Sequence, residues 1–463
     1  MNEQTDFSSL KFHPDLLHNL ASLGYTQMTP IQAQSLPAIL AGKDVIGQGK
    51  TGSGKTAAFG LGLLEKLDVK AFRIQSLVLC PTRELADQVA KEIRRLGRGV
   101  HNIKVLTLCG GTPFGPQVGS LEHGAHIIVG TPGRIEEHLR KGKLKLSAVN
   151  MLVLDEADRM LEMGFQPALD AIIEQVPTQR QTLLFSATYP REIESIAKRI
   201  MIQPVLVQVA STHDNTSIEQ HFYKVEGHKH RLSAVRILLM HFRPQSTLVF
   251  CNTKRETQAV ADALISHGFS ALALHGDLEQ RDRDQTLVQF ANNSVSVLVA
   301  TDVAARGLDI DALDAVINYQ IAHDAEIHLH RIGRTGRAGS TGIACSLYSD
   351  EEAHRVALLE AKVDPIKDSE ALPARSLLDK APMQPTMATL QIDGGKKQKV
   401  RAGDILGALT GDQGITAKQV GKISLFDNWA YVAVSRDAVQ PALRKLGGGK
   451  LKGRSFRIRL IQN

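Results

Sequence analysis

Short apolar runs alternate along this chain with segments whose apolar residues recur at helical spacing. Residues 77–80, 127–129 and 151–154 have the length and composition of strands buried in a parallel sheet. Residues 57–64 follow an earlier run, residues 45–46, with helical spacing. Because this alternation continues to about residue 350, we expect an α/β fold in which helices flank parallel sheets.

Two of these runs are repeated at almost the same distance. The run that leads into Thr82 is echoed by the run that leads into Thr253, 171 positions later. The run that ends at Thr131 is echoed by the run that ends at Thr301, 170 positions later. Buried strands resemble one another in their apolar residues, but this does not explain the shared threonines. The spacing therefore predicts a duplicated α/β unit.

Two polar or proline-rich segments divide the chain. Residues 210–217 contain no apolar run and predict a hinge between the duplicated units. Residues 364–385 contain four prolines and predict a second linker. The expected domains are residues 1–209, 218–364 and 386–463.

Residues 49–56 read G-K-T-G-S-G-K-T between an apolar run and a helical segment, which fits the phosphate-binding pattern G-x-x-x-x-G-K-[ST]. Glycines allow backbone N–H groups to surround phosphates, while Lys55 reaches the outer phosphates and the Thr56 hydroxyl meets Mg²⁺. The predicted phosphate-binding residues are Gly49, Lys50, Thr51, Gly52, Ser53, Gly54, Lys55 and Thr56.

Asp155 and Glu156 follow the buried run at residues 151–154, and the carboxyl ends of parallel strands are where open α/β sheets bind ligands. One of these carboxylates can hold Mg²⁺ while the other orients or deprotonates water. The alternative is a solvated acidic turn beside an unrelated glycine-rich loop, which requires two coincidences. The pair of motifs predicts a nucleoside triphosphatase.

The positive charge of the chain is concentrated at its end. The net charge is +7, but residues 386–463 contain 14 Lys and Arg against 5 Asp and Glu, a balance of +9. A compact basic module on a near-neutral body indicates a polyanionic partner, most often nucleic acid. The alternative is a basic tail that serves solubility alone.

The cysteines and the N-terminus bear on compartment. The four cysteines stand singly in apolar runs, without metal-ligand spacing, and predict buried thiols in a reducing environment. The N-terminus is polar, and no apolar run approaches the length of a membrane span. We expect a cytoplasmic protein with no membrane partner.

Further short motifs occur in both halves. In the first half they are Phe7, Gly24-Tyr25, Thr29-Pro30-Ile31-Gln32, Pro81-Thr82-Arg83-Glu84-Leu85, Gly110-Gly111, Thr131-Pro132-Gly133-Arg134, Asp155-Glu156-Ala157-Asp158 and Ser186-Ala187-Thr188. In the second half they are Gln280 with Arg283, the segment Thr301 to Asp309, and the segment His330 to Arg337. In this order they resemble the motifs of the DEAD-box family of RNA helicases, over residues 7–350.

This resemblance implies two tandem RecA-like domains that bind ATP and Mg²⁺ and hydrolyse ATP when RNA is bound. It implies adenine recognition by Tyr25 and Gln32, a nucleotide contact from Asp309, and catalysis by Lys55, Asp155, Glu156 and two arginine fingers, Arg334 and Arg337. Ala338 stands where some relatives carry an aromatic residue, so adenine recognition rests on Tyr25 and Gln32. The implied RNA contacts are Thr82, Arg83, Gly111, Thr131, Gly133, Arg134, Thr253 and Thr301.

The last segment resembles an RNA-recognition motif, which implies a C-terminal α+β RRM-like domain. Residues 427–434 correspond to its third strand, where Trp429 and Tyr431 either stack on bases or pack in the core. The strand candidate at residues 389–392 carries no aromatic residue. The better candidates for RNA contact are basic residues, Lys396, Lys397, Lys450, Lys452 and Arg454.

The combination of helicase motifs and this last domain resembles a bacterial subfamily, the DbpA-type helicases. That resemblance implies an ATPase that large-subunit ribosomal RNA stimulates and that the C-terminal domain recruits to a hairpin of 23S rRNA during ribosome assembly. We expect a monomer. Two other functions fit the residues. One is an ATP-gated RNA clamp with little unwinding activity, and the other is a DNA translocase, because no residue can be shown from sequence to read a 2′-hydroxyl.

Overall fold

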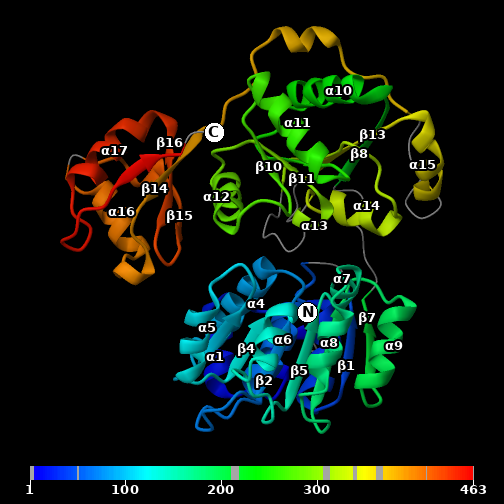
Figure 1. The fold of residues 1–463 in the computed structure, drawn as a ribbon, viewed down its shortest axis with the longest axis vertical. Coiled ribbons are helices and arrows are strands. Elements are labelled where there is room, and N and C mark those ends of the chain that lie inside the picture. The colour runs from blue at the N-terminus through cyan, green and yellow to red at the C-terminus, as the bar shows by residue number, and fades with distance from the viewer. Residues whose placement is uncertain are drawn as a thin grey trace. The chain divides into compact units, whose positions relative to one another are not determined.

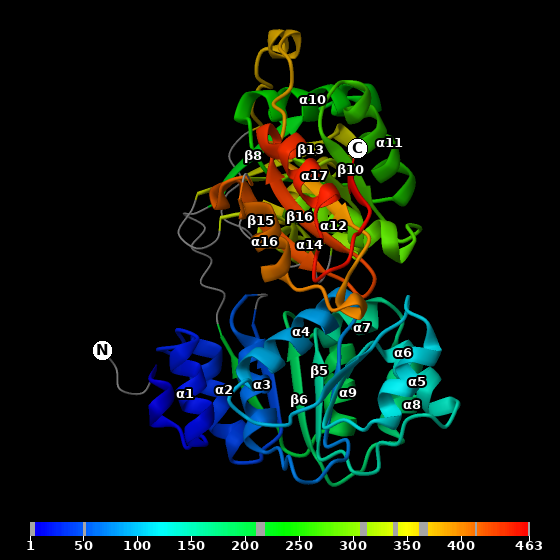
Figure 2. The same cartoon turned by 90° about the vertical axis from the view of Figure 1, so that its left-hand side faces the viewer.

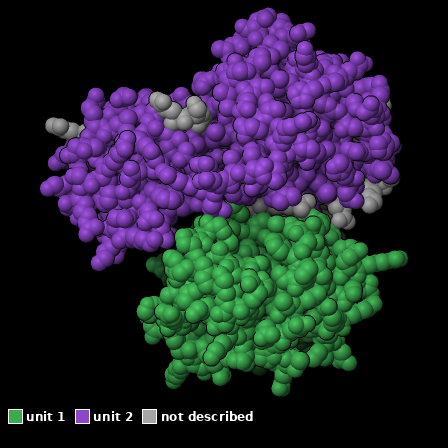
Figure 3. All heavy atoms as spheres, viewed as in Figure 1, with its two compact units in different colours: residues 1–212, 307–309 green, residues 213–306, 310–463 purple. Residues whose placement is uncertain are grey.

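The computed structural model describes residues 5–49, 52–209, 218–305, 313–336, 341–360, 369–412 and 414–461. The chain divides into two compact units, coloured separately in Figure 3. The first unit contains a seven-stranded sheet, and the second contains a six-stranded and a four-stranded sheet. The predicted fold class, two RecA-like parallel-sheet domains followed by a small RRM-like α+β domain, is confirmed.

In the first unit, helices cover both faces of a parallel sheet with strand order β3-β4-β2-β5-β6-β1-β7 (Figure 1). Successive strand residues enter opposite cores: Val78 packs in one cluster, and Leu77 and Leu79 pack in the other. The strands are β1 (Val45–Gln48), β2 (Ser76–Leu79), β3 (Val105–Leu108), β4 (Ile127–Gly130), β5 (Met151–Asp155), β6 (Gln181–Ser186) and β7 (Val205–Gln208). The helices are η2 (Phe7–Ser9), α1 (Pro14–Ser22), α2 (Pro30–Leu40), α3 (Lys55–Glu65), α4 (Arg83–Leu96), α5 (Phe114–Glu122), α6 (Pro132–Arg140), α7 (Ala157–Glu162), α8 (Gln166–Ile173) and α9 (Arg191–Ile200).

The six-stranded sheet of the second unit is also parallel, with strand order β10-β11-β9-β12-β13-β8. Its strands are β8 (Ile218–Lys224), β9 (Thr247–Phe250), β10 (Ala271–Leu274), β11 (Val297–Ala300), β12 (Ala315–Asn318) and β13 (Gly342–Tyr348). The helices around it are α10 (Gly227–Phe242), α11 (Lys254–Ser266), α12 (Gln280–Ala291), α13 (Asp302–Ala305), α14 (Ala325–Ile332), α15 (Ala353–Glu360), η4 (Asp350–Glu352) and η5 (Arg375–Asp379).

The two parallel sheets confirm the duplication. β9 and β11 are neighbours in the second sheet, as β2 and β4 are in the first. Two of the echoed threonines follow β2 and β9 and cap the next helix: the Thr82 hydroxyl accepts from the Leu85 N–H at 3.2 Å, and the Thr253 hydroxyl accepts from the Glu256 N–H at 3.2 Å. A threonine at this position satisfies a backbone donor of the first helical turn.

The C-terminal sheet is antiparallel, with strand order β15-β16-β14-β17. Ala388, Leu390 and Ile392 of the central strand face a core that α16 and α17 close. The elements are β14 (Met387–Ile392), η6 (Lys396–Gln398), α16 (Ala402–Thr410), η7 (Ala417–Gln419), β15 (Val420–Leu425), β16 (Ala430–Ser435), η8 (Arg436–Ala438), α17 (Val439–Gly448) and β17 (Ile458–Leu460).

The second face of this small sheet is buried as well. Thr389, Gln391 and Tyr431 alternate with the core residues of β14 and β16, yet each is at most 1% exposed. An antiparallel sheet in a small domain commonly leaves this face to solvent. Here it lies beside α12 of the same unit in both views (Figures 1 and 2), and the polar contacts described next join the two.

These contacts come from α12 and the turn after it. The Asn292 side-chain amide donates to the Thr389 hydroxyl at 3.0 Å, and the Ser294 hydroxyl lies 2.7 Å from the same atom. The Arg281 guanidinium lies over the Trp429 ring, 5.2 Å from its centre. The sequence left Trp429 and Tyr431 between base stacking and the domain core. The structure places Trp429 against Arg281 of the helicase domain and buries Tyr431 on the second face of the sheet, edge to face with Phe426.

The proline-rich segment is only partly a spacer. Its first residues, from Asp364, lie outside the described residues. Beyond them the Glu370 carboxylate lies 2.9 Å from the His221 ring, and the Glu370 N–H donates to the Phe222 carbonyl at 2.8 Å. Leu377 and Leu378 pack on the core beneath α10. This part of the predicted linker therefore belongs to the packed body of the second helicase domain.

The four cysteines are buried and free, as predicted: Cys80, Cys109, Cys251 and Cys345. Among the described helices, none combines the length and the apolar character that crossing a bilayer requires.

Trp429 is the only tryptophan of the chain, so its fluorescence reports on the contact with α12. A cation–π contact at a partly exposed site contributes about 0.5–1 kcal/mol. Arg281→Ala in the full chain should therefore raise the acrylamide quenching of Trp429. Arg255→Ala, at an exposed arginine of α11, is the matched control. Equal quenching in both variants would show that Arg281 does not cover the ring.

Candidate nucleotide and RNA site

The phosphate-binding loop joins β1 to α3 as predicted. Gly52 and Gly54 have φ values of +82° and +95°, a conformation that residues with a Cβ rarely adopt. Lys55 is the first residue of α3, and its buried ammonium donates to the Gly49 carbonyl across the loop. The loop therefore closes on its own lysine. A bound phosphate can take the place of the Gly49 carbonyl as the acceptor for the Lys55 ammonium. Lys50 and Thr51 lie outside the described residues.

Asp155 ends β5, and its carboxylate is 3% exposed. Burial, with repulsion from Glu156, raises the pKa of Asp155 to about 7, although Lys55 opposes the shift. A buried carboxylate whose charge is incompletely compensated fits a site for Mg²⁺, which binds through one or two carboxylates, a hydroxyl and phosphate oxygens. The described residues hold no group of three acidic, histidine or cysteine side chains that could bind a metal without such partners.

Glu156 follows with a left-handed backbone, at φ +50°. For a residue with a Cβ this conformation costs on the order of 1 kcal/mol, and such strain clusters at functional sites. This conformation turns the chain sharply between β5 and α7. The Asp155 and Glu156 side chains therefore do not point to opposite faces of the sheet, as successive residues of a strand would. The Asp155 carboxylate accepts from the Glu156 N–H at 3.1 Å.

Asp158 links the acidic motif to the end of β6. Its carboxylate accepts from the Thr188 N–H at 3.0 Å and from the Thr188 hydroxyl at 2.9 Å. The Ser186 carbonyl, also at the end of β6, accepts from the Gly49 N–H at 3.0 Å. The end of β6 thus contacts the phosphate loop through Ser186 and the acidic motif through Thr188.

Gln32 and Tyr25 have defined partners. The Gln32 amide accepts from the Thr29 N–H at 2.9 Å and donates to the Gly54 carbonyl at 3.1 Å, which joins this residue to the phosphate loop. The Tyr25 hydroxyl donates to Glu92 of α4 at 2.7 Å. Burial, with the Glu92 charge, raises the pKa of Tyr25 to about 12. The Tyr25 ring is therefore held in place at its hydroxyl end.

The predicted RNA contacts of the first unit gather at one part of the sheet. They follow β2, β3 and β4, which are adjacent strands, and the carboxyl ends of parallel strands share one edge. Gly111 has φ +74° in the turn after β3. The Arg134 guanidinium donates to the Thr112 carbonyl at 3.0 Å and pairs with Glu137 at 3.0 Å. The structure brings together Thr82, Arg83, Gly111, Thr131, Gly133 and Arg134.

The second helicase sheet presents its own edge. Thr253 and Thr301 follow β9 and β11, which are paired. Arg331 is 1% exposed and donates to both Asp302 carboxylate oxygens at 2.7 Å. It also donates to Asn252 at 2.9 Å and to the Gln320 carbonyl at 2.8 Å. Arg331 therefore fastens the ends of three strands and is not a solvated surface residue.

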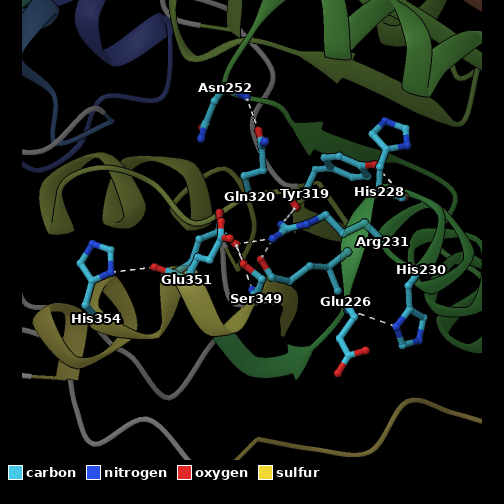
Figure 4. A network of polar contacts seen from close by, with 12 residues as sticks. Glu226, His228, His230, Arg231, Asn252, Tyr319, Gln320, Ser349, Glu351 and His354 are labelled. Atoms are coloured by element: carbon cyan, nitrogen blue, oxygen red, sulfur yellow. Dashed lines mark hydrogen bonds and ion pairs between the residues drawn. The ribbon is translucent and has the colours of Figure 1, made fainter.

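A second buried arginine holds the same sheet. Figure 4 shows Arg231 of α10 directed at the carbonyl of Tyr319, and it also donates to the carbonyl of Leu347. Its other partner is Glu352, which accepts from the Ser349 N–H at 3.0 Å. Of the expected arginine fingers, Arg334 is 8% exposed in the turn after α14. Arg337 and Asp309 lie outside the described residues.

The basic residues of the C-terminal domain are exposed: Lys396, Lys397, Lys450, Lys452 and Arg454. Lys450 also lines a pocket of about 250 Å³ between α16 and α17, together with Lys445 and glycines of both helices. This pocket lies on the helical layer of the domain, whereas the Lys396 and Lys397 N–H groups donate to the Phe426 and Asp427 carbonyls, just before Trp429.

Sequence reasoning missed residues that act through others. Gln117 and His138 lie beneath the Gly110-Gly111 turn, and Glu92 holds Tyr25. Asp302 and Asn252 were part of quoted segments, but nothing local to them showed that Arg331 is their partner. A buried histidine carries no sequence signal of its own, because such residues more often serve packing.

Three known families match successive parts of the chain. The DEAD/DEAH box helicase family matches residues 29–196, and the helicase conserved C-terminal domain matches residues 230–339. The DbpA RNA binding domain matches residues 389–460. These ranges contain, in turn, the phosphate loop with the acidic motif, the second helicase sheet, and the C-terminal antiparallel sheet.

Individual relatives agree. The chain is 55% identical over 459 residues to the ATP-dependent RNA helicase DbpA of Escherichia coli, which covers 99% of this chain and 100% of that one. It is 35% identical to the helicase of the same name from Bacillus subtilis, with 98% of each chain covered.

Among solved structures, yeast Dbp5 bound to RNA and ADP-BeF3 has a TM-score of 0.70 at 28% identity, covering 79% of this chain and 95% of that one. Mss116p bound to single-stranded RNA and AMP-PNP has a TM-score of 0.71 at 26% identity, covering 79% and 78%. The chain thus belongs to the DEAD-box family of ATP-dependent RNA helicases, within its DbpA type, and is an ATP-hydrolysing, RNA-binding enzyme.

Proposed function

We propose that this helicase acts on 23S rRNA during assembly of the large ribosomal subunit. RNA-stimulated ATP hydrolysis separates short duplexes locally, and residues 386–463 recruit the enzyme to an rRNA hairpin. The observation that carries this proposal is the division of work in the C-terminal domain. Its strand face is occupied by α12, while its balance of +9 is displayed on exposed lysines and arginines.

The first unit binds the triphosphate. Backbone N–H groups of residues 49–56 and the N-terminus of α3 surround the phosphates, and Lys55 exchanges the Gly49 carbonyl for the outer phosphate oxygens. Mg²⁺, when bound, neutralises phosphate charge, with Asp155 and the Thr56 hydroxyl as its protein ligands. Glu156 orients and deprotonates the attacking water. Tyr25 and Gln32 contact the adenine.

The second unit completes the reaction. Arg334 and Arg337 stabilise the charge that develops on the transferred phosphoryl group once the two units close, and Asp309 contacts the nucleotide. Closure also brings the RNA contacts of both units onto one strand, so ATP and RNA binding favour each other. The domains we propose are residues 1–209 and 386–463, with a second helicase domain that begins at residue 218 and includes the packed segment around Glu370 and Leu377, in a monomer of the cytoplasm.

Two alternatives stay testable. An ATP-gated RNA clamp would hydrolyse ATP and hold RNA without displacing a strand, so strand displacement measured at equal ATPase rates separates it from a helicase. A DNA translocase would be stimulated equally by DNA and RNA of the same sequence, whereas the proposed function requires stimulation by RNA alone.

Lys55 and Glu156 should separate binding from chemistry. Lys55→Ala removes a phosphate contact and should weaken ATP binding as well as turnover. Glu156→Gln should keep ATP bound and abolish hydrolysis, and because it removes the repulsion on Asp155 it should not weaken Mg²⁺-dependent affinity. Nucleotide affinity and hydrolysis are measured for both, with Glu162→Gln on the exposed side of α7 as control. Hydrolysis by Glu156→Gln at the parent rate would refute its assigned role.

The basic surface should set the salt dependence of RNA binding. Each lost phosphate contact lowers the slope of log affinity against log salt by about 0.7 for single strands and 0.9 for duplexes. Neutralising Lys450, Lys452 and Arg454 together should therefore lower that slope by roughly two to three. Affinity for an rRNA hairpin is measured across a salt series, with folding checked by circular dichroism.

The matched control neutralises three exposed basic residues elsewhere in the same domain: Lys418, Lys422 and Arg436. It makes the same change in net charge and should alter the slope much less. Equal effects from the two triple variants would mean that overall charge, and not this surface, attracts the RNA.

A further inference from the structure

The turn that carries Gly110 and Gly111 is held from below by buried polar side chains. After β3, the Cys109 carbonyl accepts from the Gln117 amide at 2.9 Å and from the Thr112 hydroxyl at 3.1 Å. The Gln117 amide donates to the Thr112 hydroxyl as well. Gln117 is 8% exposed and lies on α5, so the helix that follows the turn also fixes its two ends.

Gln117 is held in turn by His138 of α6. The His138 Nε2 lies 2.9 Å from the Gln117 side-chain oxygen, and His138 is fully buried. Both Gln117 amide hydrogens are used at the turn, so its oxygen must accept and the His138 Nε2 must carry the proton. Rotating the amide would set its oxygen against the Cys109 carbonyl, which excludes that assignment.

His138 is therefore a neutral donor. Its Nδ1 has no hydrogen-bond partner within the described residues, so a proton there would be buried without an acceptor. Burial, with the nearby Arg134 charge, lowers the pKa of His138. The Phe114 ring stacks on the imidazole with centroids 4.2 Å apart, and the Lys141 ammonium lies 4.1 Å from the centre of that ring. These contacts leave the imidazole one orientation.

The same helix carries a second support. Arg134 and His138 are four residues apart on α6 and therefore share a face. Arg134 donates to the Thr112 carbonyl, while His138 acts through Gln117 on the Cys109 carbonyl. α6 thus fixes both sides of the Gly110-Gly111 turn, and its own first residues follow Thr131. The turns after β3 and β4 are locked into one arrangement.

We propose that His138, through Gln117, is a positioning residue for RNA binding: it sets the Gly110-Gly111 turn at the distance from Thr131 and Arg134 that a bound strand requires. This inference rests on the proposed RNA contacts of the first unit. It predicts an effect on RNA affinity that is separate from ATP binding, because the phosphate loop lies across the sheet at β1.

The test measures RNA-stimulated ATPase of the full chain with His138→Leu, which leaves the Gln117 oxygen without a donor. The RNA concentration for half-maximal stimulation should rise on the order of tenfold, while kcat at saturating RNA and the KM for ATP stay within about twofold. His138→Gln places an amide N–H where Nε2 lies and should restore most of the affinity. Gln117→Met cuts the relay at its other end and should reproduce the loss.

The matched control is His126→Leu. His126 is equally buried in the same unit and bonds through both ring nitrogens, where His138 bonds through Nε2 alone, and it precedes β4 at the opposite edge of the sheet. It should lower the melting temperature without moving the RNA concentration for half-maximal stimulation. If His138→Leu and Gln117→Met behave like this control, the positioning role is refuted and the residues serve stability alone.

A double variant tests whether His138 and Gln117 act through the same contact, and the parent chain tests the proposed function itself. The double variant His138→Leu with Gln117→Met should bind RNA no more weakly than either single variant, because both cut one relay. Additive losses would contradict the relay. If the parent chain shows no RNA stimulation, the proposed function fails, whereas a stimulated parent with unshifted variants overturns only the role of His138.

Discussion

Parallel strand pairing is the constraint on which this structure depends. In a parallel sheet every strand points the same way, so all carboxyl ends meet at one edge. The phosphate loop, the acidic motif and the threonine-bearing turns each follow a strand, and they come together although about 130 residues separate Lys55 from Thr188. The six strands of the second helicase sheet repeat the order of the first six strands of the first sheet, and β7 has no counterpart.

Buried charged residues fall into two kinds, those with full partners within the chain and those suited to bind a ligand. Arg331 is matched by Asp302, and Asp158 is matched by two donors from Thr188, so both are complete within the chain. Asp155 is different, because burial and Glu156 raise its pKa to about 7. Burial destabilises the ionised form of such a carboxylate, and a nearby cation stabilises that form. Asp155 is therefore suited to bind a cation.

The fold and much of the candidate site could be predicted from the sequence wherever neighbouring residues form a recognisable pattern. Thr82 and Thr253 revealed the duplication because N-cap chemistry demands a particular residue type at the end of a strand. The location of Trp429 could not be predicted, since its partner Arg281 lies almost 150 residues away on another domain. The partner of Gln117 was equally hidden, because a histidine on an amphipathic helix shows no sign of a polar relay.

The C-terminal domain shows how one fold can serve two contacts. Its strand face joins α12 while Lys450 and Lys452 remain exposed, so the selection of RNA that we propose and the attachment to the helicase body use different surfaces. The most direct test compares the full chain with a chain ending at Pro385, which keeps Glu370 and Leu377 packed in the second unit. Stimulation of ATPase by 23S rRNA and by an unrelated RNA of equal length is measured for each. Our account predicts that the shortened chain keeps basal hydrolysis and loses its preference for 23S rRNA, and full retention of that preference would contradict it.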